Sequence, residues 1–120
     1  MASVSFVPQS LDVTCYAGDG ATLRLTLTNP AGAPVELTGT VQAQIRQSTD
    51  GAVVDSFAAD LSAGPAGVVV LTLTGAQTAA LRDGASPFEG VWDAQWTPAS
   101  GQPTTLVRGR LVCEPDVTRA

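Results

Sequence analysis

The feature that most restricts the fold of this chain is an alternation of apolar and polar residues that recurs along most of its length. In the clearest case, residues 22–28, Leu23, Leu25 and Leu27 alternate with threonine and arginine. Successive side chains of a β-strand point to opposite faces of the sheet, so the pattern predicts a strand with one buried face. An α-helix, with 3.6 residues per turn, does not place these leucines on one side.

Six further segments are predicted as strands, namely residues 11–15, 40–46, 52–57, 68–74, 89–96 and 104–113. Turn-forming residues separate them, including Asp50-Gly51, a pair typical of hairpins. Residues 75–81 are the one helical candidate, because glycine and proline soon end that alanine-rich stretch. About seven short antiparallel strands predict an all-β fold, either a two-sheet sandwich or a small barrel.

The length of the chain predicts one domain. A chain of 120 residues can bury roughly two-thirds of its unfolded surface, so it needs no metal or disulfide to fold. We expect an N-terminal arm at residues 1–9, the β-domain at residues 10–114 and a C-terminal tail at residues 115–120. The first nine residues lack the charged and apolar regions of a secretory signal, and we expect synthesis in the cytoplasm.

The charge of the chain argues against two classes of partner. Its net charge is −5, and its six basic residues are all arginines, scattered singly along the sequence. Nucleic-acid binding needs a basic patch that displaces counterions from phosphates, and an anionic membrane attracts the same kind of patch. We therefore expect neither nucleic acid nor membrane as a partner.

The residue types that carry most catalysis are missing or unsuitably spaced. The chain has no histidine, which excludes Ser-His-Asp and Cys-His arrangements. Asp50, Asp55, Asp60 and Asp93 follow no metal-loop or glycosidase spacing, and we interpret them as solvated side chains. The glycine-rich turns do not lead into a sizeable helix, so they are not phosphate loops. We expect no enzyme activity, no cofactor and no metal.

Two cysteines lie near opposite ends of the chain. Cys15 and Cys113 share the inward phase of their strands, which predicts two small buried thiols. If the first and last strands are neighbours, a disulfide between them is the alternative. Two cysteines alone cannot complete a structural zinc site.

The strand at residues 89–96 places Trp92, Ala94 and Trp96 on one face. We interpret both tryptophans as core residues; the alternative is an aromatic platform that binds sugars. That alternative corresponds to a carbohydrate- or cell-surface-binding module. In the last strand, Arg108 and Arg110 point away from the core face, as solvent or interface residues do, and we regard them as candidate partner contacts.

The closing part of the chain resembles a group of known proteins. Residues 91–96 read VWDAQW, and residues 105–119 read TLVRGRLVCEPDVTR. This hairpin is similar to the ending of small β-sandwich proteins of tailed bacteriophages, and residues 16–20, 34–39 and 73–81 match the style of that group. Cys113 and Trp96 replace the aliphatic residues usual there, and both changes fit the inward phase.

The resemblance implies an immunoglobulin-like β-sandwich in a virion. Proteins of this group occur in collars, at tail-fibre attachment sites, in baseplates and as capsid decoration. We therefore expect an accessory subunit that binds neighbouring capsid, neck or tail proteins, in many copies on a symmetric particle. The uncharged arm at residues 1–9 contains Val4, Phe6 and Val7, which we regard as further candidate partner contacts.

Overall fold

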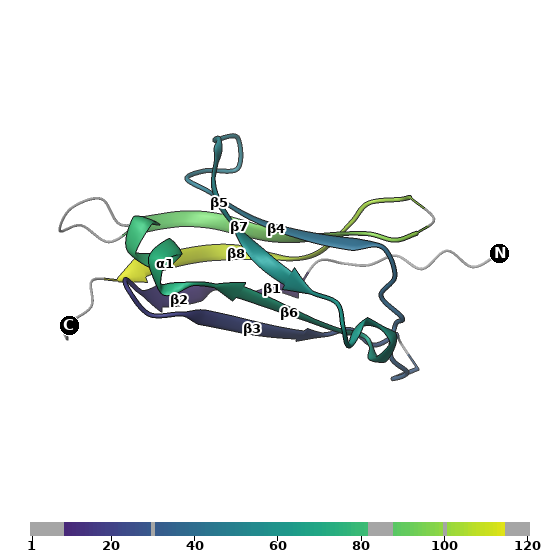
Figure 1. Ribbon diagram of the computed structural model, residues 1–120. Coiled ribbons are helices and arrows are strands. Elements are labelled where there is room, and N and C mark those ends of the chain that lie inside the picture. The colour runs from purple at the N-terminus through teal and green to yellow at the C-terminus, as the bar shows by residue number, and fades with distance from the viewer. Residues whose placement is uncertain (1–8, 30, 82–87, 100, 115–120) are drawn as a thin grey trace.

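The structure, a computed structural model, describes residues 9–29, 31–81, 88–99 and 101–114. Over these residues the chain forms a mixed β-sheet with one short α-helix (Figure 1), which confirms the predicted all-β class. The strands are β1 (Gln9–Ser10), β2 (Val13–Tyr16), β3 (Ala21–Thr26), β4 (Thr40–Arg46), β5 (Val53–Asp60), β6 (Val68–Leu73), β7 (Phe88–Thr97) and β8 (Thr104–Glu114). The helical elements are the 3-10 turn η1 (Gly64–Ala66) and α1 (Gly75–Leu81).

The strands form one continuous sheet that folds over on itself. Their order is β1-β8-β7-β4-β5-β6-β3, and β2 also pairs with β8. The sheet bends at β5. Residues 53–57 of this strand pair with β4, and its residues 58–60 pair with β6. In Figure 1, β5 crosses diagonally between the two layers. The two layers are thus joined through a shared strand, which extends to Asp60, three residues beyond the predicted end at residue 57.

The first strand corrects the prediction that all strands are antiparallel, because β1 and β2 both run parallel to β8. Gln9 pairs with Val107 and Val13 with Leu111, so the offset is 98 residues in both cases (107 − 9 and 111 − 13). β1 and β2 are therefore one strand in a single register, interrupted at residues 11 and 12.

Gly109 on β8 allows the interrupted segment at residues 11 and 12 to pack closely against that strand. A Cβ atom built on Gly109 would overlap the carbonyl oxygen of Leu11. The same carbonyl accepts a hydrogen bond of 3.0 Å from the indole N–H of Trp92. Only a residue without a side chain lets the interrupted strand approach β8 this closely.

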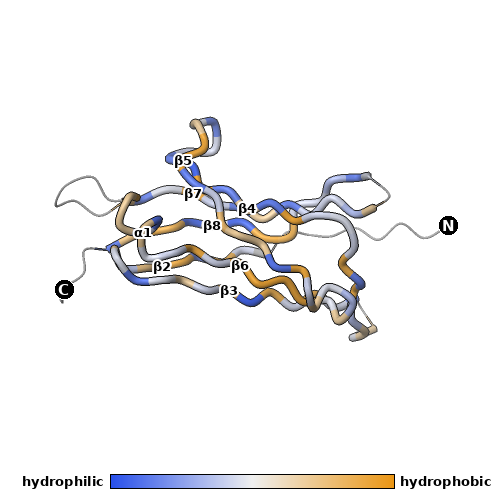
Figure 2. Tube along the Cα trace, in the orientation of Figure 1, coloured by the Kyte–Doolittle hydropathy of each residue, from blue (hydrophilic) through white to orange (hydrophobic). Residues whose placement is uncertain are grey.

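One hydrophobic core lies between the layers, and the predicted alternation accounts for most of it. In β7, Phe88, Gly90, Trp92, Ala94 and Trp96 are buried and the residues between them are exposed or half-buried. β6 has no exposed residue, and its apolar run is orange in Figure 2. β8 departs from the alternation, because a bulge opposite Ala94 and Gln95 inserts one extra residue and leaves Leu106 and Val107 both buried.

Helix α1 has the bounds that we predicted, and the residue before it explains where it begins. The hydroxyl of Thr74 accepts a hydrogen bond from the backbone N–H of Gln77, and the side-chain oxygen of Gln77 accepts one from the N–H of Thr74. This reciprocal pair is a capping box. The buried Thr78 hydroxyl then binds the turn between β2 and β3, through Asp19 and Gly18.

Candidate partner-binding surface

The polar face of β4, β7 and β8 carries two rows of side chains that cross the sheet. In the first row Gln44 lies beside Asp93, Asp93 beside Arg108, and Arg108 beside Ser10. In the second row Arg46 lies beside Val91, and Val91 beside Arg110. We call the six residues on the three central strands the arginine face: Gln44, Arg46, Val91, Asp93, Arg108 and Arg110.

The arginine face is hollowed. A depression of about 490 Å³ lies over it, lined by both rows together with Asp12 and Thr49. Its floor is formed by the sheet itself, under which Trp92 is buried. A strand face is usually flat, so a depression of this size offers room for side chains of another molecule.

Arg46 is held at one side of the depression by its own hairpin. Its guanidinium donates to the carbonyl oxygen of Gly51 at 2.6 Å and to the side-chain oxygen of Gln44 at 3.2 Å. Gly51 belongs to the Asp50-Gly51 turn between β4 and β5. The turn therefore orients a guanidinium that is only half-buried.

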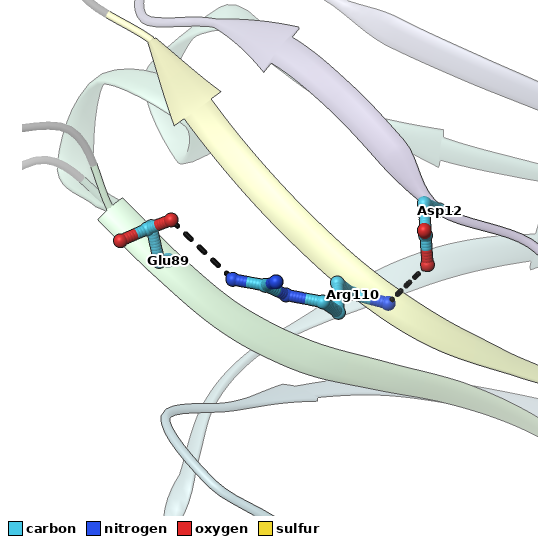
Figure 3. Close-up of polar contacts among 3 residues, drawn as sticks. All are labelled: Asp12, Glu89 and Arg110. Carbon is cyan, nitrogen blue, oxygen red and sulfur yellow. Dashed lines mark hydrogen bonds and ion pairs between the residues drawn. The ribbon is translucent and has the colours of Figure 1, made fainter.

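Arg110 is held at the opposite side by two carboxylates (Figure 3). Its backbone N–H donates to Asp12 Oδ1 at 3.0 Å, and its guanidinium forms an ion pair with Glu89 at 3.4 Å. Both side chains of the ion pair are about two-thirds exposed, at 66% and 63%. Such a pair contributes at most about 1 kcal/mol, so Arg110 can exchange Glu89 for another carboxylate at little cost.

Among the three arginines of this surface, Arg108 has the most freedom to bind. It is exposed, and its side chain forms no hydrogen bond or ion pair with another residue in the described part of the chain. Arg108 and Arg110 are two positions apart on one strand, so their side chains leave the sheet about 7 Å from each other. The planar guanidinium donates two parallel hydrogen bonds to a carboxylate, so two of them side by side suit an acidic segment.

The charge of this surface is mixed. Three guanidiniums, those of Arg46, Arg108 and Arg110, stand beside three carboxylates, those of Asp12, Glu89 and Asp93. A polyanion would be repelled by the carboxylates, whereas a polypeptide offers both acidic groups and N–H donors. The arrangement therefore fits a protein partner better than a nucleic acid.

The structure confirms the predicted placement of Arg108 and Arg110 on the solvent face of the last strand. The structure also places Arg46 and Asp12 at the depression, and sequence analysis had not identified either residue as part of a site. Arg46 was visible as a polar residue of an alternating strand, but its neighbours depend on pairing between strands that are far apart in sequence. Val4, Phe6 and Val7 lie outside the described residues.

Both tryptophans are core residues, as we interpreted them. Trp92 is 2% exposed and packs against Phe57 with ring centroids 5.4 Å apart, and Trp96 is 8% exposed. The indole N–H of Trp96 donates to the carbonyl oxygen of Thr38 at 2.7 Å. The aromatic platform on which the carbohydrate-binding alternative depended is thus turned into the core.

Cys15 and Cys113 are direct neighbours across the pairing of β2 with β8. Both are buried, as predicted, and the structure holds them as thiols. The Cys113 thiol donates to the carbonyl oxygen of Thr78 at 3.3 Å. Burial, and then the adjacent Cys113, raise the pKa of the Cys15 thiol to about 12.

No protein-family model and no curated protein matches the chain. Among the described residues, no group of three or more histidine, cysteine, aspartate or glutamate side chains could hold a metal ion. The described part of the chain also has no helix that is both long and apolar enough to span a membrane.

Proposed function

We propose that this chain is a non-enzymatic structural subunit of a tailed-bacteriophage particle, and that it binds a neighbouring virion protein through the arginine face. The observation that carries the contact surface is the pair of exposed guanidiniums of Arg108 and Arg110 over a depression, on a chain whose net charge is −5. The phage setting is supported by the closing hairpin, to which both arginines belong. The immunoglobulin-like topology implied by the same resemblance stays a prediction.

The mode of action is geometric. A rigid sheet presents fixed side chains, and many copies on a symmetric particle make individually weak contacts additive. The net negative charge of the chain makes its copies repel one another in solution. The guanidiniums of the arginine face attract an acidic segment of a different protein. Capsid, neck and tail proteins are the candidate neighbours.

An incorporation assay tests the contact surface. Particles are grown from the phage genome that carries this gene, with the phage copy deleted and the protein supplied from a plasmid. The variant Arg108→Ser/Arg110→Ser should reduce the copies per particle about tenfold or more, because central arginines carry much of the affinity of an interface. Quantitative mass spectrometry of purified particles measures the loss.

Arg24→Ser is the matched control, because Arg24 is an exposed arginine of β3, outside the arginine face. It should be incorporated like the wild type. Both variants should keep the wild-type melting temperature, since exposed arginines contribute little to stability. Equal incorporation of the double variant and the control would refute the assigned surface.

The N-terminal arm gives an independent test of the wider proposal. Deletion of residues 1–8 should leave the folded domain intact but abolish incorporation, if Val4, Phe6 and Val7 pair with a neighbouring subunit. Circular dichroism checks the fold, and the same particle assay measures incorporation. Unchanged incorporation would show that the arm is not a partner contact.

A further inference from the structure

The two cysteines form a pair that the proposed function does not use. Cys15 on β2 and Cys113 on β8 are paired directly across a parallel pairing, and both side chains are buried in the core. Adjacent strands lie about 4.8 Å apart, which is inside the 4.4–6.8 Å range of Cα separations found in disulfides. The spacing of the paired strands is therefore compatible with a bond between Cys15 and Cys113.

We propose that Cys15 and Cys113 are an oxidation site, at which a low-molecular-weight disulfide such as oxidised glutathione converts the two thiols into a bond between the first and last strands. This inference does not depend on the phage assignment or on the arginine face. It concerns a covalent modification of the fold itself.

Reaction requires that β2 detach first. Cys15 is 5% exposed and Cys113 is fully buried, so a glutathione molecule cannot reach either sulfur in the closed sheet. The raised pKa of Cys15 also keeps its thiol protonated there, whereas the thiolate is the nucleophile. β2 is well placed to open, because it has four residues, pairs with β8 alone among the described strands and follows the interruption at residues 11 and 12.

The reaction is balanced in two exchange steps. In the open state the Cys15 thiolate attacks one sulfur of oxidised glutathione, which forms a mixed disulfide and releases one glutathione thiolate. The Cys113 thiolate then attacks the Cys15 sulfur, expels the second glutathione thiolate and closes the Cys15–Cys113 bond. The protein loses two protons and two electrons, and one oxidised glutathione becomes two molecules of glutathione.

The product ties both ends of the domain together. The bond closes the long segment between β2 and β8, which lowers the entropy of the unfolded chain, and it prevents β2 from detaching. A loop of this length predicts a melting temperature higher by on the order of 10–20 °C. The backbone amides of β2 should also exchange with solvent more slowly.

The test is oxidation of the reduced full chain. The protein is incubated with oxidised glutathione, and samples are analysed by mass spectrometry, thiol titration in denaturant and thermal melting. We expect a monomer that has lost the mass of two hydrogen atoms, has no titratable thiol and melts at higher temperature. The single variants Cys15→Ser and Cys113→Ser should at most gain one glutathione and should show no increase in melting temperature.

A second experiment distinguishes slow access of the oxidant to the thiols from a pair geometry that is unsuitable for a disulfide. The chain is oxidised in denaturant, where both thiols are accessible, and then refolded. The proposal requires that the disulfide form regain the near-ultraviolet circular dichroism of the reduced protein and melt above it. A chain that fails to refold, melts lower, or yields disulfide-linked dimers in place of the internal bond would overturn the proposal.

Discussion

Gly109 leaves less room for an added carbon atom than any other described glycine. A Cβ there would overlap the carbonyl oxygen of Leu11, where the strand formed by β1 and β2 is interrupted. Gly109→Ala should therefore lower the free energy of unfolding by about 1–3 kcal/mol, the usual cost of overpacking. Urea denaturation measures the change.

Gly20→Ala is the control for that substitution. A Cβ on Gly20 would lie 3.6 Å from its nearest neighbour, the carbonyl oxygen of Leu73, which is ordinary van der Waals contact. Its effect should stay within about 0.5 kcal/mol, as for most surface substitutions. If both variants are equally stable, the close approach of Leu11 to β8 is wrong.

The raised pKa of the Cys15 thiol predicts that the protein loses stability in alkaline solution under reducing conditions. Its pKa rises on folding from 9.0 to about 12, mainly through burial. Above about pH 9 the unfolded chain loses this proton and the folded chain keeps it, so the free energy of unfolding falls by up to about 1.4 kcal/mol per pH unit. Below that pH the contribution is constant.

Urea denaturation of the wild type and of Cys15→Ser across this pH range measures the effect. The serine variant lacks the titrating group, so its free energy of unfolding should fall less steeply with pH. Parallel pH profiles would contradict the burial of the thiol in the folded state.

At the level of elements, α1 is stabilised by its capping box and also forms hydrogen bonds with β5. The Gln77 side chain donates to the carbonyl oxygen of Ser56 and to Asp55, both at 2.9 Å, at the part of β5 that does not pair with β6. Thr74→Ala should cost about 1 kcal/mol, because it removes the N-cap. Thr74→Ser, which keeps the hydroxyl, should cost much less.

Gln77→Glu separates the two roles of Gln77. The glutamate can still accept the hydrogen bond from the Thr74 N–H, but it cannot donate to Ser56, and it brings a second carboxylate beside Asp55. We expect a loss of stability that shrinks at acidic pH, where the introduced carboxyl group is protonated and the repulsion disappears. Chemical denaturation at neutral and acidic pH measures it, and a loss independent of pH would contradict the contact with Asp55.

The elements that sequence alone predicted correctly are those defined by local signals. Period-2 alternation identified the buried faces of β7 and most of β8 and the half-buried face of β3, and alanine followed by glycine and proline delimited α1. The Thr74–Gln77 capping box was present in the sequence and was missed. The bulge at Leu106 leaves no clear local signal, since two adjacent apolar residues also occur in regular strands.

At the scale of the whole molecule, the long-range pairings could not be predicted. Alternation assigns a face to each strand but does not identify its neighbours, so neither the parallel pairing of β1 and β2 with β8 nor the sharing of β5 between layers followed from it. The arginine face has the same origin. Arg46 and Arg108 are 62 positions apart (108 − 46), and two strand pairings bring them together.

Taken as a whole, the molecule is a folded sheet whose proposed role is contact with other proteins. The proposed function places the chain in a phage particle, so purified particles of that phage provide the most direct test, by quantitative mass spectrometry after density-gradient separation. We predict that the chain co-purifies with the particles in multiple copies, at a ratio to the capsid protein that is the same in every preparation. Particles that form normally and contain no peptide of this chain would contradict it.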